Sequence, residues 1–217
     1  LPMNGTDGGT AFADQSATIK GSGSAKTLTS NGNPTTSTDK SYFYGSSGEF
    51  DGNDYLSLTN ADFAFGTGNF TVELWANLSS IPGSGVAGLV DTGANVNANR
   101  FSLVVYPDAR VSVDSNVNLV TGSASKVVAN QWVHIAVCRS GTGTNQTKLY
   151  INGQLDVSAT VATNFTDDDL RVGATTDGLH LNGYMQDLRI YKGTAKYTGN
   201  FVVPRSTGNG FHLKFAD

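Results

Sequence analysis

Residues 131–155, QWVHIAVCRSGTGTNQTKLYINGQL, contain two runs with alternating apolar side chains, separated by a tract of Gly, Thr, Asn and Gln. In the first run Val133, Ile135 and Val137 share one side of an extended chain, because successive side chains of a strand point to opposite faces. The tract between the runs has little to bury and predicts a hairpin loop. Asn152-Gly153 predicts a second tight turn, since both residues accept positive φ. The stretch therefore predicts three strands of an antiparallel meander, not an active-site loop.

The same alternation recurs along the chain, and GNFTVELWANL at 68–78 shows it most clearly. Further strands are expected at 86–91, 100–106, 109–114, 117–121, 132–138, 147–152, 155–161, 169–174, 179–181 and 184–191. Turn residues recur roughly every 8–12 positions, which is typical of a sandwich or barrel. Weaker patterns predict a short strand within 1–12, one strand at about 25–29 in a polar loop at 20–41, and a helical turn within 193–201.

The composition favours an all-β protein and argues against several classes of partner. Charged residues make up 15% of the chain, and nearly all the acidic ones are Asp, which prefers turns to helix interiors. The net charge is −4 with no cluster of Lys or Arg, so no nucleic-acid partner is expected. No apolar run approaches the ~20 residues of a membrane helix, so no membrane insertion is expected. Cys138 is the single cysteine, which rules out an internal disulfide. Because the first residue is Leu1, the chain is expected to be a processed or excised piece.

Four stretches of the chain carry a resemblance to a known family. They are SSGEFDGNDYLSL at 46–58, GNFTVELWANL at 68–78, the hairpin that starts at 131, and LRVGATTDGLHLNGYMQDLRIYKG at 170–193. In this order they resemble the laminin-G-like domains of the concanavalin A-like lectin/glucanase superfamily. The ending KGTAKYTGNFVVP at 192–204 resembles the variety found in phage tail and other virion proteins.

The resemblance implies an all-β fold in which two antiparallel sheets form a β-sandwich, the concanavalin A-like jelly roll. It also implies a single laminin-G-like domain over residues 1–217. FHLKFAD at 211–217 is expected to be either the last strand of that domain or the start of a following module.

The carboxylate pattern argues against an enzyme. Glucanases on this scaffold use Glu-x-Asp-x-(x)-Glu on one strand, so that the carboxylates face one cleft. The nearest match here is Glu49-Phe-Asp51-Gly-Asn-Asp54, which lacks the final Glu and is interrupted by a turn at Asp51-Gly52. His134 and Cys138 lie four residues apart on one strand, about 13 Å and too far for proton transfer. Three His and one Cys without a close pair do not make a zinc site.

The one cofactor that the resemblance suggests is a single structural Ca²⁺. Many relatives hold such an ion with backbone carbonyls and an Asp beside the last core strand. In GYMQDLRIY that position matches Asp187, and Asn4 or Asp7 would supply the N-terminal ligand. The alternative is that Asp187 accepts hydrogen bonds from neighbouring loop N–H groups.

Alternation also selects the candidates for sugar binding, which needs an aromatic ring for the apolar sugar face and polar groups for the hydroxyls. If the apolar positions of each strand face the core, five side chains face outward: Glu73, Trp75, Arg171, Arg189 and Tyr191. The alternative places Trp75 and Tyr191 beneath a long loop such as 20–41, as a satellite of the core.

These observations predict a non-catalytic recognition or adhesion module that binds carbohydrate or a cell-surface glycan. The expected location is a phage virion surface or an extracellular bacterial protein. The competing hypothesis is a purely structural virion component, a decoration or tail-fibre protein that contacts only other virion proteins.

Overall fold

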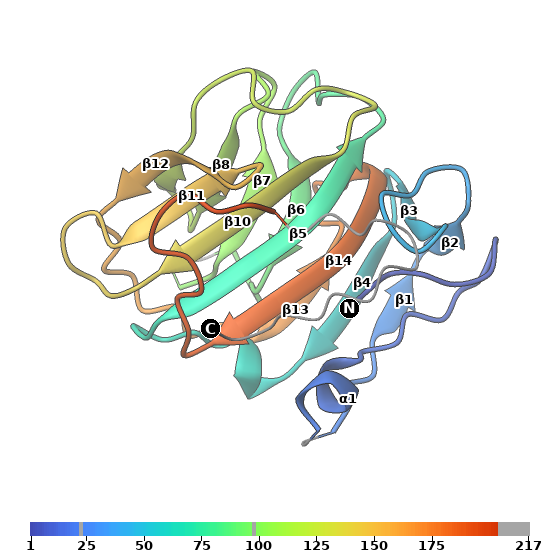
Figure 1. Cartoon of the computed structure of the whole chain (residues 1–217), viewed down its shortest axis with the longest axis horizontal. Coiled ribbons are helices and arrows are strands. Elements are labelled where there is room, and N and C mark those ends of the chain that lie inside the picture. Colours follow the sequence, from blue (N-terminus) through green and yellow to red (C-terminus); the bar gives the residue numbers. More distant parts are fainter. Residues whose placement is uncertain (22–23, 97–98, 204–217) are drawn as a thin grey trace.

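Two antiparallel seven-stranded sheets pack face to face in this computed structural model (Figure 1). The structure describes residues 1–21, 24–96 and 99–203. The predicted all-β sandwich of two antiparallel sheets is confirmed. Within the described ranges, no helix has the length and apolar character needed to cross a membrane.

The sheet nearer the viewer in Figure 1 is named the β5 sheet after its central strand, β5. In spatial order it contains β12 (Gln154–Ala159), β11 (Thr147–Ile151), β10 (Val133–Arg139), β5 (Phe70–Leu78), β14 (Asn182–Lys192), β3 (Ser47–Asp51) and β2 (Thr35–Ser37).

The second layer is named the β7 sheet. In spatial order it contains β1 (Thr29–Asn31), β4 (Tyr55–Thr59), β13 (Asp169–Val172), β6 (Ala87–Asp91), β7 (Ser102–Val105), β8 (Val111–Asp114) and β9 (Asn118–Thr121). Helical structure in the described ranges is limited to α1 (Ser16–Lys20) and the 3₁₀ turn η1 (Ala61–Phe63).

The core lies between the sheets and is built from the alternate residues that the sequence pattern selects. Phe70 and Leu74 on β5, Ile135 on β10 and Leu103 on β7 are all fully buried. Burying an apolar side chain of this size stabilises the fold by roughly 1.5–3 kcal/mol. The two layers are therefore held together by one continuous apolar contact.

The meander predicted from residues 131–155 is confirmed. β10 and β11 pair antiparallel from Ile135–Ile151 to Arg139–Thr147, and β11 pairs in turn with β12. Asn152 and Gly153 have φ values of 50° and 77°, the left-handed conformation that the turn between β11 and β12 requires.

Several weaker predictions are wrong. The N-terminal residues 1–12 form no strand but run along the edge of β2, where Thr36 exchanges backbone hydrogen bonds with Gly8 and Gly9. The stretch 193–201 has no helical turn, and 179–181 contributes only an isolated bridge. The strand expected at 25–29 begins only at Thr29. The loop predicted at 20–41 also contains β2. The prediction for 211–217 lies outside the described residues.

Arg139, the last residue of β10, is fully buried and clamps two loops to the end of the β5 sheet. Its guanidinium donates to the carbonyls of Gly68 and Thr163, both at 2.9 Å, and of Gly66 at 2.6 Å. It also contacts the rings of Phe70 and Phe165, with 4.9 Å to each centroid. Burial lowers the pKa of Arg139 to about 10, so the side chain stays protonated at neutral pH.

Replacing Arg139 with Met is expected to lower the free energy of unfolding by about 3 kcal/mol, because three buried carbonyls lose their donor. Urea unfolding measures the change. The control is Lys148→Met, which removes an exposed ammonium that donates to the Thr198 carbonyl and should cost less than about 0.5 kcal/mol. Equal effects of the two substitutions would contradict the clamp.

Candidate functional site

The five side chains predicted to bind sugar lie on two different sheets. Glu73 and Trp75 on β5, and Arg189 and Tyr191 on β14, share the outer face of the β5 sheet, where Glu73 pairs in register with Arg189. Arg171 lies on β13 in the β7 sheet and is not part of this group. Alternation assigns a face within one strand, but it does not determine which sheet the strand joins.

Trp75 faces outward but is not an exposed platform. Its side chain is only 6% exposed, because loop 40–46 covers it. The Tyr42 ring stacks on Trp75 with 3.8 Å between centroids, and Phe43 meets it edge-on at 5.6 Å. The alternative of a satellite core beneath a loop therefore describes Trp75, although the covering loop is not the segment 20–41.

A buried glutamine on β14 holds loop 40–46 in place. Gln186 Oε1 accepts the N–H groups of Tyr42 and Phe43, at 3.0 and 2.8 Å. Its Nε2 donates to the carbonyls of Phe43 and Ser46. Since every hydrogen-bonding atom of this amide is used, the cover over Trp75 is a built part of the fold.

Glu73 is buried and binds the C-terminal segment 194–203, which crosses the β5 sheet in Figure 1. Its carboxylate accepts from Lys196 Nζ at 2.5 Å and Tyr197 Oη at 2.7 Å, and His134 Nε2 lies 3.5 Å away. Burial by itself would raise the pKa of Glu73, but the hydrogen bonds from His134, Lys196 and Tyr197 outweigh it and lower the pKa to about 2. Glu73 therefore anchors this segment to the sheet and is already paired.

The predicted calcium ligands are not arranged as one donor set. Both oxygens of Asp187 accept from the Arg189 guanidinium, at 3.0 and 2.7 Å. Asp7 accepts from the backbone and hydroxyl of Thr38, and Asn4 is exposed. Within the described ranges, no three His, Cys, Asp or Glu residues are grouped so as to hold a metal. In this arrangement the residues do not fit Ca²⁺, because the Asp187 carboxylate is already paired with the Arg189 guanidinium. The structural Ca²⁺ stays a prediction.

The carboxylates of the glucanase-like stretch have structural partners. Glu49 accepts from the Tyr184 hydroxyl at 2.9 Å. Asp54 is buried and accepts from the backbone N–H groups of Asn33 and Asp51. Glu49 thus joins β3 to β14, and Asp54 stabilises turns in the way that Asp commonly does.

A different candidate site lies on the outer face of the β7 sheet. A row of register partners crosses five of its strands with polar side chains: Arg171, Asp91, Ser102, Asp114 and Asn118. The neighbouring residues of the row along β6, β7 and β8 (Val90, Leu103 and Val113) are in the core, so the side chains of the row point away from it.

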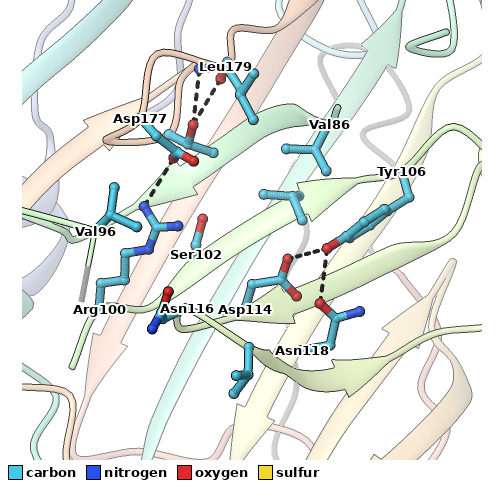
Figure 2. A pocket seen from close by; sticks show the side chains of 13 residues that line it. Val86, Val96, Arg100, Ser102, Tyr106, Asp114, Asn116, Asn118, Asp177 and Leu179 are labelled. Atoms are coloured by element: carbon cyan, nitrogen blue, oxygen red, sulfur yellow. Dashed lines mark hydrogen bonds and ion pairs between the residues drawn. The ribbon is translucent and has the colours of Figure 1, made fainter. Parts of the chain in front are cut away.

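Loops between these strands surround Ser102, Asp114 and Asn118 of the row and form a pocket of about 240 Å³ (Figure 2). Its lining residues come from β7, β8 and β9 and from the connecting loops: Val86, Val96, Arg100, Ser102, Val104, Tyr106, Asp114, Asn116, Val117, Asn118, Thr175, Asp177 and Leu179. Polar groups line the floor and valines and a leucine lie around it, the mixture expected of a small-molecule site.

Arg100 is the one cation among the described residues that line the pocket. Its Nη1 lies 3.1 Å from Asp177 Oδ1 and 3.5 Å from Asp91 Oδ2. Burial raises the pKa of Asp91, and the charge of Arg100 offsets this only in part. Burial would also raise the pKa of Asp177, but hydrogen bonds from Thr175 and Arg100 outweigh it and lower that pKa. The two carboxylates fix the direction of the guanidinium.

Tyr106 closes the opposite side of the pocket, as Figure 2 shows. Its hydroxyl donates to Asp114 Oδ2 at 2.7 Å, and the Asn118 side-chain amide lies 3.0 Å from the same hydroxyl. Burial, followed by the hydrogen bond to Asp114 and the charge of that carboxylate, raises the pKa of Tyr106 to about 12. The phenol is therefore protonated at neutral pH, and its single proton is directed to Asp114.

Three of the lining residues carry a buried polar atom without a hydrogen-bond partner among the described residues. These atoms are Arg100 Nε, Ser102 Oγ and Asp114 Oδ1. Ser102 faces the Asp91 carboxylate and opposes the rise of its pKa that burial causes, but the contact falls short of hydrogen-bond geometry. An unpaired buried polar atom costs about 1–3 kcal/mol, so water or a ligand is expected to satisfy these three.

Reasoning from the sequence missed this pocket. The strands at 100–106 and 109–114 were predicted, and their alternation puts Ser102 and Asp114 on the outward side. The same alternation puts Arg100 and Tyr106 on the side of Ser102, but Asp177 comes from a loop, and a strand pattern does not say which strands and loops lie side by side. The available signal was small polar residues at outward positions, which leave space that a loop can enclose.

A family model described as the concanavalin A-like lectin/glucanases superfamily matches residues 50–215. This is most of the chain, so the protein belongs to that superfamily, and the predicted relationship is confirmed at this level. The virion-associated variety and the extent of the domain stay predictions. No curated protein matches the chain in sequence.

Several solved structures that are similar in fold are described together with a sugar or a ganglioside. Domain 4 of the extracellular arabinanase AbnA from Geobacillus stearothermophilus, in complex with arabinotriose, matches 80% of this chain and 85% of its own, with a TM-score of 0.60 and 18% identity. The CBM40 of the Ruminococcus gnavus IT-sialidase, bound to α2,3 sialyllactose, matches 66% and 88%, with a TM-score of 0.53 and 14% identity.

Botulinum neurotoxin type C, in a structure described by its dependence on two ganglioside molecules for cell entry, has a TM-score of 0.57 and 13% identity. The match covers 78% of this chain but only 44% of that one. At these identities the likenesses establish the fold alone.

Replacing Trp75 with Ala is expected to destabilise the fold by about 3–5 kcal/mol, because it removes a buried ring that stacks on Tyr42. Chemical unfolding followed by circular dichroism measures the loss. The matched control is Trp132→Ala, since Trp132 is half-buried and should cost less. An unchanged unfolding midpoint for Trp75→Ala would show that Trp75 is an exposed platform after all.

The pairing of Glu73 predicts a pH-dependent stability. Its pKa of about 2 in the fold is below the ordinary 4.5, so its contribution is complete above pH 4.5 and is lost as the pH falls toward 2. Wild type should exceed Glu73→Gln in unfolding free energy by up to about 3 kcal/mol at pH 7, with the gap closing by pH 2–3. Urea unfolding at several pH values measures this gap. A gap independent of pH would contradict the assignment.

Proposed function

We propose that the protein is a non-catalytic carbohydrate-recognition module whose ligand occupies the pocket on the β7 sheet. The observation that carries the proposal is the set of unpartnered polar atoms in this pocket, Arg100 Nε, Ser102 Oγ and Asp114 Oδ1. Sugar hydroxyls both donate and accept hydrogen bonds, so one sugar residue is able to satisfy donors and acceptors together. Tyr106 and the surrounding valines supply apolar surface for the C–H groups of a sugar ring.

The contrast between the two sheets supports this location. On the β5 sheet the outward groups of Glu73 and Gln186 have partners within the protein, and Trp75 is covered. On the β7 sheet the polar row opens into the pocket. A ligand that binds the β5 sheet would have to displace these contacts, whereas the pocket needs no such rearrangement.

The structural relatives support the class of ligand. Two of them are described in complex with arabinotriose and with sialyllactose, and a third by its interaction with gangliosides. The first belongs to an extracellular enzyme, which supports an extracellular location for this protein. A place on a phage virion or a secreted bacterial protein is a further prediction, which rests on the resemblance of residues 192–204.

The proposal is tested with two tyrosine variants on opposite faces. Tyr106→Ala removes a ring from the pocket, and Tyr191→Ala removes a half-buried ring from the outer face of the β5 sheet. A glycan array identifies the strongest ligand, and calorimetric titration compares the variants with wild type. We expect Tyr106→Ala to weaken binding tenfold or more, on the order of one lost stacking contact and its hydrogen bonds, and Tyr191→Ala to leave it unchanged.

Melting curves of both variants control for folding. The opposite result, with loss of binding for Tyr191→Ala only, would place the site on the β5 sheet. Absence of binding to every glycan, with and without calcium, would overturn the proposal and favour the purely structural virion protein.

A further inference from the structure

We infer that the pocket on the β7 sheet selects neutral sugars and rejects acidic ones, such as sialic and uronic acids. The inference rests on the proposed function and names the class of its ligand. The observations behind it are the charges around the pocket, the hydrogen-bonding character of its unpartnered atoms and the apolar residues of its rim.

The charge around the pocket is negative. Asp114 and Asp177 line it, and Asp91 lies 3.5 Å from Arg100, so three carboxylates and one guanidinium lie in or beside the pocket. Both Asp91 and Asp177 already contact Arg100, whereas Asp114 has no ion pair with a cation among the described residues. An acidic sugar would bring a further carboxylate into this field, where like charges repel strongly because water is partly excluded.

Two further cations near the pocket are directed elsewhere. The Arg110 guanidinium stacks on the Tyr106 ring, 3.9 Å from its centroid, and pairs with Asp108 at 2.7 Å. Arg171 lies over the Tyr55 ring at 5.3 Å and is not among the residues that line the pocket. Arg110 is therefore paired with a carboxylate, and neither guanidinium lines the pocket.

The unpartnered atoms also favour a neutral sugar over an acidic one. Arg100 Nε can only donate, and Asp114 Oδ1 accepts when the carboxylate is ionised. A hydroxyl can donate to Asp114 or accept from Arg100, and neighbouring hydroxyls of one sugar can do both at once. A carboxylate can only accept, so it would satisfy Arg100 and leave Asp114 unpaired.

The rim of the pocket fits a ring with an apolar face. Val96 and Val117 are 53% and 61% exposed, and Val86 and Leu179 also line the opening. Exposed apolar side chains beside a polar floor are suited to a pyranose or furanose, whose C–H groups and hydroxyls lie on different faces. Small anions such as phosphate lack such a face.

The test uses matched pairs of glycans that differ only in one acidic residue. Lactose is compared with 3′-sialyllactose, and arabinotriose with an oligosaccharide of the same length that ends in a uronic acid. We expect calorimetric titration of the wild-type chain to show that the neutral member of a bound pair binds at least about tenfold more tightly than the acidic member.

Two charge-neutralising variants test whether the charge within the pocket causes the selectivity for neutral sugars. Asp114→Asn removes the acceptor charge within the pocket, while Asp39→Asn removes the same charge from an exposed position outside it. Asp114→Asn is expected to weaken neutral-sugar binding about tenfold and to reduce the preference for neutral over acidic sugar. Asp39→Asn is expected to change neither the affinity nor the preference, and the melting temperature of each variant controls for folding.

The outcomes separate the two claims. If acidic glycans bind better than their neutral counterparts and Tyr106→Ala abolishes that binding, the selectivity is overturned while the proposed function stands. If Tyr106→Ala and Asp114→Asn both leave glycan binding intact, the pocket is not the site, and both the inference and the proposed location are overturned.

Discussion

The central strands β5 and β10 are buried on both faces, and this constraint governs the rest of the structure. One face packs on the core, and loop 40–46 and segment 194–203 cover the other. All residues of β5 and β10 are buried as a result. A strand buried on both sides has no water to satisfy its polar side chains, so each needs a partner within the protein.

The fold meets most of that requirement with a few committed polar side chains, although Asn77 Oδ1, His134 Nδ1 and Thr147 Oγ1 have no hydrogen-bond partner among the described residues. Gln186 uses its whole amide to hold loop 40–46, and Glu73 holds the C-terminal segment through Lys196 and Tyr197. Arg139 does the same for three carbonyls at the end of β10. These groups resemble functional residues in type, since they are charged or polar and clustered, but their hydrogen bonds are used in stabilising the fold.

The β7 sheet differs because its polar row is enclosed by loops without being filled. Arg100, Ser102 and Asp114 keep buried atoms with no partner in the described part of the chain, which costs stability and is expected where a ligand or water completes the site. The two sheets therefore have different roles. The β5 sheet provides rigidity, and the β7 sheet offers the open polar surface on which the proposed recognition depends.

The amino-acid sequence was sufficient to predict the all-β class, the meander at 131–155 and the inward positions such as Phe70 and Ile135, because side-chain alternation is a local property of an extended chain. It also predicted that Trp75 and Glu73 face outward. Long-range packing was needed to show that Tyr42 and Lys196 cover these two residues, and that Arg171 belongs to the other sheet. It also decided that Arg100, Tyr106 and Asp177 meet around one pocket. These contacts join residues far apart in the chain, and the burial that sets them depends on how loops fold over a sheet, which no local period records.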